Sequence, residues 1–227
     1  MYFYDSTYIL VLIGLFITII VQGYMTRTFN KYQRISANIN LSAVEVAKKI
    51  MQSNGIYDVS IGRVYGNMTD HYAPLKKELN LSDSTVNSNS IASIGVAAHE
   101  VGHAIQDHEH FGLLVLQMAI TPTLSFVSRL SFPVLFIGIL LQSLDLIWLG
   151  IYAFSATFIY QILTLPIEFD ASRRAINTLR DLSILDENEL YGAKKVLTAA
   201  AFTYVAAAAT TALQLLRFLL IFGRRRD

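Results

Sequence analysis

The stretch YILVLIGLFITIIVQG at residues 8–23 decides the fold class of this chain. It carries no charge, and its length is close to the roughly 20 residues that cross the hydrocarbon core of a bilayer. A secretory signal peptide needs a basic start and a small-residue cleavage site, whereas residues 1–23 contain Asp5 and no Lys or Arg. We therefore predict a retained transmembrane helix.

Further apolar runs follow a long polar stretch. We predict two spans at about 131–145 and 147–165, forming a hairpin, and an apolar C-terminal helix over 197–222. Residues 112–128 are predicted to lie along the membrane interface or to line the protein. The composition agrees, because 53% of the 227 residues are hydrophobic and only 15% are charged. The net charge of +1 argues against a nucleic-acid partner.

Local signals predict smaller elements in the polar residues 27–110. Ser42 and Glu45 form a capping box that starts a helix over 43–54, and Gly55 ends it. Residues 59–81 predict a small antiparallel sheet. Apolar residues then recur at helical spacing through IASIGVAAHEVGHAIQDHEH at 91–110.

Two more helix starts are expected near the end of the chain. Pro166 is typical of a first helical turn, so we predict that a new helix begins there. Asp186 and Glu189 are expected to cap the helix that leads into the C-terminal apolar run.

The sharpest chemical signal is His99-Glu100-Val101-Gly102-His103, an HExxH sequence on a predicted helix. Residues four apart share one helix face, so both imidazoles can bind one Zn²⁺ while Glu100 acts as general base on the water at the zinc. The chain has no cysteine, which leaves His, Asp and Glu as metal ligands. The small residues around the histidines leave room for a close backbone approach.

A catalytic zinc usually has three protein ligands and one open position, so a third ligand is expected elsewhere. Glu168 lies in TLPIEFDASRRA, 65 residues after His103, and an even number of membrane crossings would return the chain to the same side. His110, seven residues after His103, shares its helix face if that helix continues. The candidates are His71, His108, His110, Asp107, Glu109, Glu168 and Asp170.

Four stretches together resemble the bacterial membrane-bound zinc metallopeptidases of the YugP-like family. They are TDHYAPLKKELNLS at 69–82, VAAHEVGHAIQ at 96–106, TLPIEFDASRRA at 164–175 and TAAAFTYVAAA at 198–208. The wider resemblance is to gluzincins, in which HExxH is followed by E-x-x-A-D. It implies His99, His103 and Glu168 as zinc ligands, with Asp170 as the alternative third ligand. Ser172 departs from the pattern, which has Asp there, so Asp170 is also the candidate for the supporting carboxylate.

The same resemblance implies a strand edge beside the zinc helix that binds the substrate backbone, and a side chain that stabilises the oxyanion. His71 and Tyr72, on a predicted strand ahead of the zinc helix, are the candidates for this catalytic role. Arg173 and Arg174 are candidates to pair with a carboxylate near the zinc.

Taken together, the sequence predicts a mainly α membrane protein with about four transmembrane or membrane-embedded helices and a small α+β zincin-like catalytic region. The expected segments are a membrane anchor at 1–25, a catalytic region with the HExxH helix at 26–110, a helical hairpin region at 111–165, a helix with the third ligand at 166–196 and a membrane-embedded helix at 197–227.

Basic residues flanking the spans predict the orientation. Residues 27–110 carry eight Lys or Arg and residues 166–195 carry five, so both are expected on the cytoplasmic side of a multi-pass cell-membrane protein. Arg224, Arg225 and Arg226 conflict with this rule if residues 197–222 cross completely.

The expected function is a membrane-anchored zinc endopeptidase that acts on proteins or peptides at the cytoplasmic face. Zn²⁺ would lower the pKa of its water, and Glu100 would take the proton. One alternative is an intramembrane protease of the site-2 type, which takes an Asp ligand from an LDG-type context; Asp145 in SLDLIW lacks that glycine. The other is a noncatalytic zinc scaffold or sensor, closed by a fourth ligand such as His71 or His110. Neither the substrate nor the oligomeric state is predicted.

Overall fold

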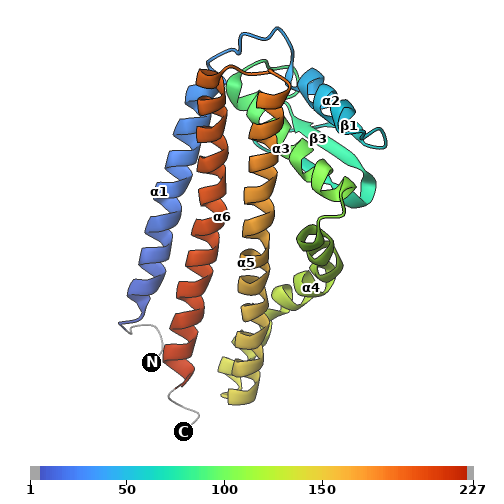
Figure 1. Ribbon diagram of the computed structural model, residues 1–227. Helices are drawn as coiled ribbons and strands as arrows, with labels where there is room; N and C mark the ends of the chain where they lie inside the picture. Colours follow the sequence, from blue (N-terminus) through green and yellow to red (C-terminus); the bar gives the residue numbers. More distant parts are fainter. Residues whose placement is uncertain (1–5, 224–227) are drawn as a thin grey trace. The chain divides into compact units, whose positions relative to one another are not determined.

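Helices dominate the computed structural model of the chain, which describes residues 6–223 (Figure 1). Asp5 and Arg224–Arg226, which entered the predictions above, lie outside the described residues. In chain order the elements are α1 (Tyr8–Gln33), α2 (Ala43–Ser53), β1 (Ser60–Val64), β2 (His71–Ala73), the 3-10 turn η1 (Pro74–Lys76), β3 (Glu78–Ser82), α3 (Ile91–His108), α4 (Gly112–Leu140), α5 (Leu144–Asp181) and α6 (Glu187–Phe222).

Four of the described helices, α1, α4, α5 and α6, are long and apolar enough to cross a membrane. Large apolar side chains such as Leu12, Phe16 and Phe136 are exposed on them, which water would disfavour and lipid accepts. The predicted class, a mainly α membrane protein with four candidate spans and a small sheet, is confirmed.

Two predicted breaks in the apolar half of the chain are wrong. Residues 112–128 and most of 131–145 form the single helix α4, with Pro122 and Pro133 inside it. Pro166 likewise lies inside α5 and does not start a new helix. Proline removes one backbone hydrogen bond, but a backbone in lipid keeps its remaining bonds by staying helical. A proline is therefore a weak helix boundary in this kind of sequence.

The sheet is mixed, so the prediction of an antiparallel sheet is corrected. Its strand order is β1-β3-β2, with β3 parallel to β1 and antiparallel to β2. The tight reversal between β2 and β3 lies at η1 and Lys77, whose φ is 51°. Gly66 and Asn67 lie in the longer connection between β1 and β2. Asp70 accepts hydrogen bonds from the main chain and side chain of Ser82, which ties that connection to the end of β3. Because β2 comes last in the strand order, it is an edge strand.

Helix starts agree well with the sequence signals. The capping box of Ser42 and Glu45 is present at α2, and Gly55 follows its end with a φ of 71°. Asp186 and Glu189 exchange backbone and side-chain hydrogen bonds at the start of α6. These two predictions are confirmed.

The chain divides into two compact units. Among the described residues, the first contains 6–22, 116–166 and 202–223, and its buried cluster includes Leu135, Ile151 and Phe218. The second contains 23–115 and 167–201, and its larger core is built from α2, α3, the sheet, the end of α5 and the start of α6. The candidate site described next lies wholly in the second unit. The five sequence segments predicted above stay predictions.

Candidate metal centre

Helix α3 carries the HExxH residues on the rim of the second unit's core. Ser90 caps its N-terminus by accepting a hydrogen bond from the main chain of Ser93. Ile94, Val101 and their small neighbours are buried in the core, which leaves His99 and His103 on one partly buried face. Their rings lie 4.8 Å apart between centroids, close to perpendicular. The helix alone therefore brings the two imidazoles together.

Glu168 of α5 completes a group of three. Its Oε2 lies 3.3 Å from Nε2 of His99, and its Oε1 lies 3.7 Å from Nε2 of His103. One ligand atom from each of the three residues lies within 4.8 Å of the others, a spacing suited to a single metal ion. Glu168 is buried, and its Oε2 has no hydrogen bond in the structure. A buried carboxylate oxygen without a hydrogen-bond partner beside two imidazoles is what a metal ion would satisfy.

The other nitrogen of each ring faces a polar side chain. Nδ1 of His99 lies 3.1 Å from the hydroxyl of Ser172, and Nδ1 of His103 lies 3.0 Å from Oε1 of Gln106. Metal-binding histidines usually donate the second ring N–H to such an oxygen, which fixes the tautomer and leaves Nε2 for the metal. Gln106 in turn donates to the carbonyl of Ile167 and to Asp170. Both ligand helices thus share one hydrogen-bond network.

Gly102 allows α3 and α5 to approach closely enough for this geometry. A Cβ at this position would lie 2.5 Å from the main-chain oxygen of Ala171. That distance is far inside a normal contact, so only glycine fits without separating the helices. The sequence expectation of a close backbone approach beside the histidines is confirmed.

Glu100 points toward the edge of the sheet. Its buried Oε2 accepts a hydrogen bond of 3.0 Å from the main-chain N–H of Tyr72 on β2. The hydroxyl of Tyr72 donates to Asp107 over 2.6 Å, and Lys77 pairs with the same carboxylate at 2.7 Å. Strand β2 is therefore attached to α3 at two points, one of which orients Glu100.

The carboxylates of this network raise the pKa values of the groups that they contact. Burial opposes the charged form of His103, yet the carboxylates of Glu168 and Glu100, with Gln106, raise the pKa of His103 to about 9. Burial and the bond to Asp107 raise the pKa of the Tyr72 hydroxyl well above its ordinary value. The hydrogen bond to Asp107 likewise raises the pKa of Lys77. Without a metal ion, His103 is thus held as the cation that pairs with Glu168.

The remaining ligand candidates have other partners or positions. Asp170 accepts from Gln106 and pairs with Arg173 and Arg174, while Glu109 pairs with Arg174. Asp107 binds Tyr72 and Lys77 as described. His108 is the exposed last residue of α3, and His110 lies beyond that helix with a φ of 52°, so it does not share the face of His103. His71 is exposed on β2, with Nδ1 2.9 Å from the carbonyl of Thr69.

Sequence reasoning missed the supporting roles of Gln106 and Ser172. Gln106 follows His103 by three residues, and Ser172 follows Glu168 by four, so each shares a helix face with a candidate ligand. Ser172, noted only as a departure from the E-x-x-A-D pattern, supplies an oxygen to His99. Helical spacing was the available signal for both residues.

These features define a helical membrane protein with a partly buried group of two histidines and one glutamate next to a second glutamate, the class to which zinc metallopeptidases belong. The chain belongs to the family described as "Putative neutral zinc metallopeptidase", whose model matches residues 7–223. It is 46% identical over 200 residues to the "Putative membrane protease YugP" of Bacillus subtilis (strain 168), covering 88% of each chain. No solved structure matches the chain. The resemblance inferred from the sequence is confirmed.

Proposed function

We propose that this protein is a membrane-anchored zinc endopeptidase in which His99, His103 and Glu168 hold the metal and Glu100 is the general base. The observation that carries the proposal is the convergence of the three ligand atoms within 4.8 Å, with Glu100 next to His99 on the same helix. The family and the similarity to a membrane protease support the same reaction class. When bound, zinc would polarise the scissile carbonyl and acidify the attacking water.

The chain's own residues supply the remaining chemistry. The Tyr72 N–H holds one oxygen of Glu100, which orients the carboxylate to accept the proton of the attacking water and to pass it to the leaving amine. Ser172 and Gln106 hold the imidazoles so that both Nε2 atoms face Glu168. The oxyanion role of His71 and Tyr72 stays a prediction that rests on the family resemblance.

Strand β2 is the proposed site for the substrate backbone. It lies at one edge of the sheet, and the Tyr72 N–H is directed toward Glu100 rather than toward β3. An extended peptide added at this edge would run beside Glu100 and would pair with main-chain groups of β2 other than the Tyr72 N–H, which is bonded to Glu100. This arrangement favours an unfolded or loop segment of a protein as substrate.

The two alternatives receive less support. Within residues 6–223 the metal-binding group has three members, which leaves room for the open position of a catalytic site, whereas a structural zinc normally has four protein ligands. Asp145, the candidate for a site-2 type ligand, lies in the first turn of α5 and is not in the group. The endopeptidase is therefore the function that these residues fit best.

Metal analysis together with casein cleavage tests the proposal on detergent-purified full-length protein. We expect the wild type to hold one zinc and to cleave casein. Glu100→Gln should keep zinc and lose at least about a hundredfold in cleavage, because it removes the base and keeps the ligands. Glu168→Ala should lose zinc. The Glu45→Gln variant, which changes a carboxylate at the exposed cap of α2, is the matched control.

Three results would contradict the proposal. Full zinc retention by Glu168→Ala would show that the third ligand is another residue, with Asp170 the first to test. Full activity of Glu100→Gln would exclude it as the base. A wild type that holds zinc and cleaves no peptide would favour the scaffold function.

We also propose that the active site faces the cytoplasm, on the basis of the basic residues in 27–110 and 166–195. Because the chain has no cysteine, single cysteines report the side of the membrane directly. Lys48→Cys should be protected from an impermeant thiol reagent in intact cells, whereas Asp145→Cys should react. The reverse pattern would place the site outside.

A further inference from the structure

A second site is indicated by a cavity between the polar ends of α5 and α6. Its volume is about 310 Å³, and it lies within the second unit. Residues of α5 spaced three or four apart line one wall, and residues of α6 with the same spacing line the other. The cavity is thus formed by two facing helix stripes, and it is separate from the group of His99, His103 and Glu168.

The cavity is basic. Arg173, Arg180 and Lys194 line it, with Asn177 and Thr198 as neutral polar neighbours, and no described lining residue carries a carboxylate. Arg180 meets Glu187 only loosely, at 3.6 Å between two exposed side chains, and Lys194 has no ion pair within residues 6–223. Arg173 pairs with Asp170. A ligand for this cavity should therefore carry negative charge.

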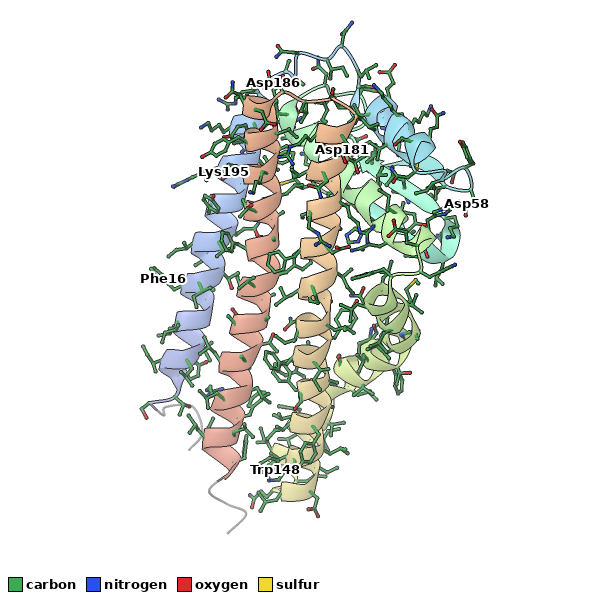
Figure 2. The ribbon with its side chains drawn as sticks, viewed as in Figure 1. Phe16, Asp58, Trp148, Asp181, Asp186 and Lys195 are labelled. Carbon is green, nitrogen blue, oxygen red and sulfur yellow. The ribbon has the colours of Figure 1, made fainter. Side chains whose placement is uncertain are left out.

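The cavity has a cationic part and an apolar part. The two helices are connected by the short segment 182–186, and Figure 2 shows Asp181 and Asp186 where α5 ends and α6 is about to begin. Arg180 and Lys194 lie toward this connection, whereas Phe169 and Ala201 lie toward the apolar stretches of the same helices. The end near the connection is cationic, and the other end is lined by Phe169 and Ala201, with Arg173 one turn from Phe169 and paired with Asp170, so the expected ligand is amphiphilic.

We propose that this cavity binds an anionic phospholipid, with the phosphate near Arg180 and Lys194 and the acyl chains toward Phe169. The proposal rests on charge complementarity, on the apolar residues at one end of the cavity and on the α5 lining residues, which directly follow the apolar stretch 144–166 of a candidate span in the sequence. Basic residues close to a membrane surface attract anionic lipids, and arginine holds phosphate through two parallel hydrogen bonds.

Ser172 connects this lipid site to the metal centre. The same residue lines the cavity and contacts Nδ1 of His99. A bound lipid would therefore contact a side chain that holds a metal ligand, and bilayer composition would influence peptide cleavage. This consequence rests on the proposed endopeptidase function, whereas lipid binding itself does not.

Native mass spectrometry of the full-length protein in detergent measures the binding directly. We expect phosphatidylglycerol to bind at least tenfold more tightly than phosphatidylcholine. The double variant Arg180→Gln/Lys194→Gln should bind phosphatidylglycerol roughly 25-fold more weakly, because each cation near an anionic lipid contributes about fivefold. The control Lys48→Gln/Lys49→Gln removes the same charge from α2 and should bind as the wild type does. Zinc content reports separately on the metal centre.

Several results would overturn the lipid assignment. Unchanged binding by the Arg180/Lys194 variant would show that the cavity is not the site. An equal loss in the α2 control would show unspecific attraction. Displacement of phosphatidylglycerol by millimolar inorganic phosphate would identify a site for free anions. Displacement by casein-derived peptides would assign the cavity to the substrate path.

Discussion

Gly102 of α3 and Ala171 of α5 are in backbone contact, and a Cβ on Gly102 would lie 2.5 Å from the Ala171 oxygen. This contact lies between His99 and His103 on one helix and beside Glu168 on the other. The distance between the two helices at this point therefore determines whether the three ligand atoms can meet.

Gly102→Ala should consequently weaken the metal centre. Overpacking a contact of this kind costs about 1–3 kcal/mol, and separation of the helices would draw Glu168 away from the imidazoles. We expect a lower melting temperature and at least tenfold weaker zinc binding. Gly95→Ala, also on α3, is the control. Its Cβ would meet the side chain of Ala193 on α6 at 3.3 Å, which is a milder contact. Zinc affinity equal to that of the wild type would refute the role given to Gly102.

Ser172 provides a prediction about the support of His99. Ser172→Ala removes the oxygen next to Nδ1, and loss of such a partner typically costs about 10–100-fold in metal affinity. Ser172→Asp restores an acceptor and should recover most of the loss. Zinc titration against a chelator measures all three proteins. Thr178→Ala, on the same helix outside the network, is the control; a similar loss there would make the effect unspecific.

Zinc binding should depend on pH because His103 must give up its proton. The pKa of His103 is raised from 6.5 to about 9 in the metal-free protein, so the proton competes with zinc below about pH 9. One displaced proton makes affinity rise about tenfold per pH unit. The free energy of unfolding of the metal-free protein changes with pH in the opposite direction. The stability that the His103–Glu168 pair contributes is complete below pH 6.5 and is lost as the pH rises through about 9. A zinc affinity that stays constant from about pH 7 to 8.5 would contradict the His103–Glu168 pair.

Tyr72→Phe separates a structural role of the hydroxyl from a catalytic one. The variant leaves buried Asp107 with Lys77 and without its second donor, which should cost about 1–3 kcal/mol of stability. The main-chain N–H that orients Glu100 is retained. Because the hydroxyl already binds Asp107, we favour this structural role over the oxyanion role that the family resemblance implies for Tyr72, and we expect the melting temperature to fall while kcat stays within about tenfold. A hundredfold loss of kcat with normal zinc content and stability would instead assign the hydroxyl to the oxyanion.

The candidate metal centre was more predictable than the fold around it. His99 and His103 needed only helical spacing, and Glu168 was reached through its motif. The caps at Ser42 and Asp186 were also predictable, because they depend on residues three apart. The order of the strands was not predictable, because no residue in or near β1 indicates that β3 will pair with it. The helix start predicted at Pro166 was wrong. Proline ends helices in soluble proteins more often than in lipid, where the backbone keeps every remaining hydrogen bond by staying helical.

The supporting network was hidden for a different reason. Gln106 and Ser172 are common helix residues, and their roles depend on contacts between α3 and α5 that no single helix contains. The sequence made Tyr72 a candidate for the oxyanion role, whereas in the structure its main-chain N–H binds Glu100. Side-chain identity carries no information about such a backbone contact.

The three candidate ligands are synthesised at different times. His99 and His103 leave the ribosome well before Glu168, and the 29 residues of α4 and much of α5 are synthesised in between. A nascent chain that has exposed only α3 therefore lacks the third group of the centre. If the three residues bind zinc as proposed, the zinc-bound enzyme cannot form until α4 and most of α5 have been made.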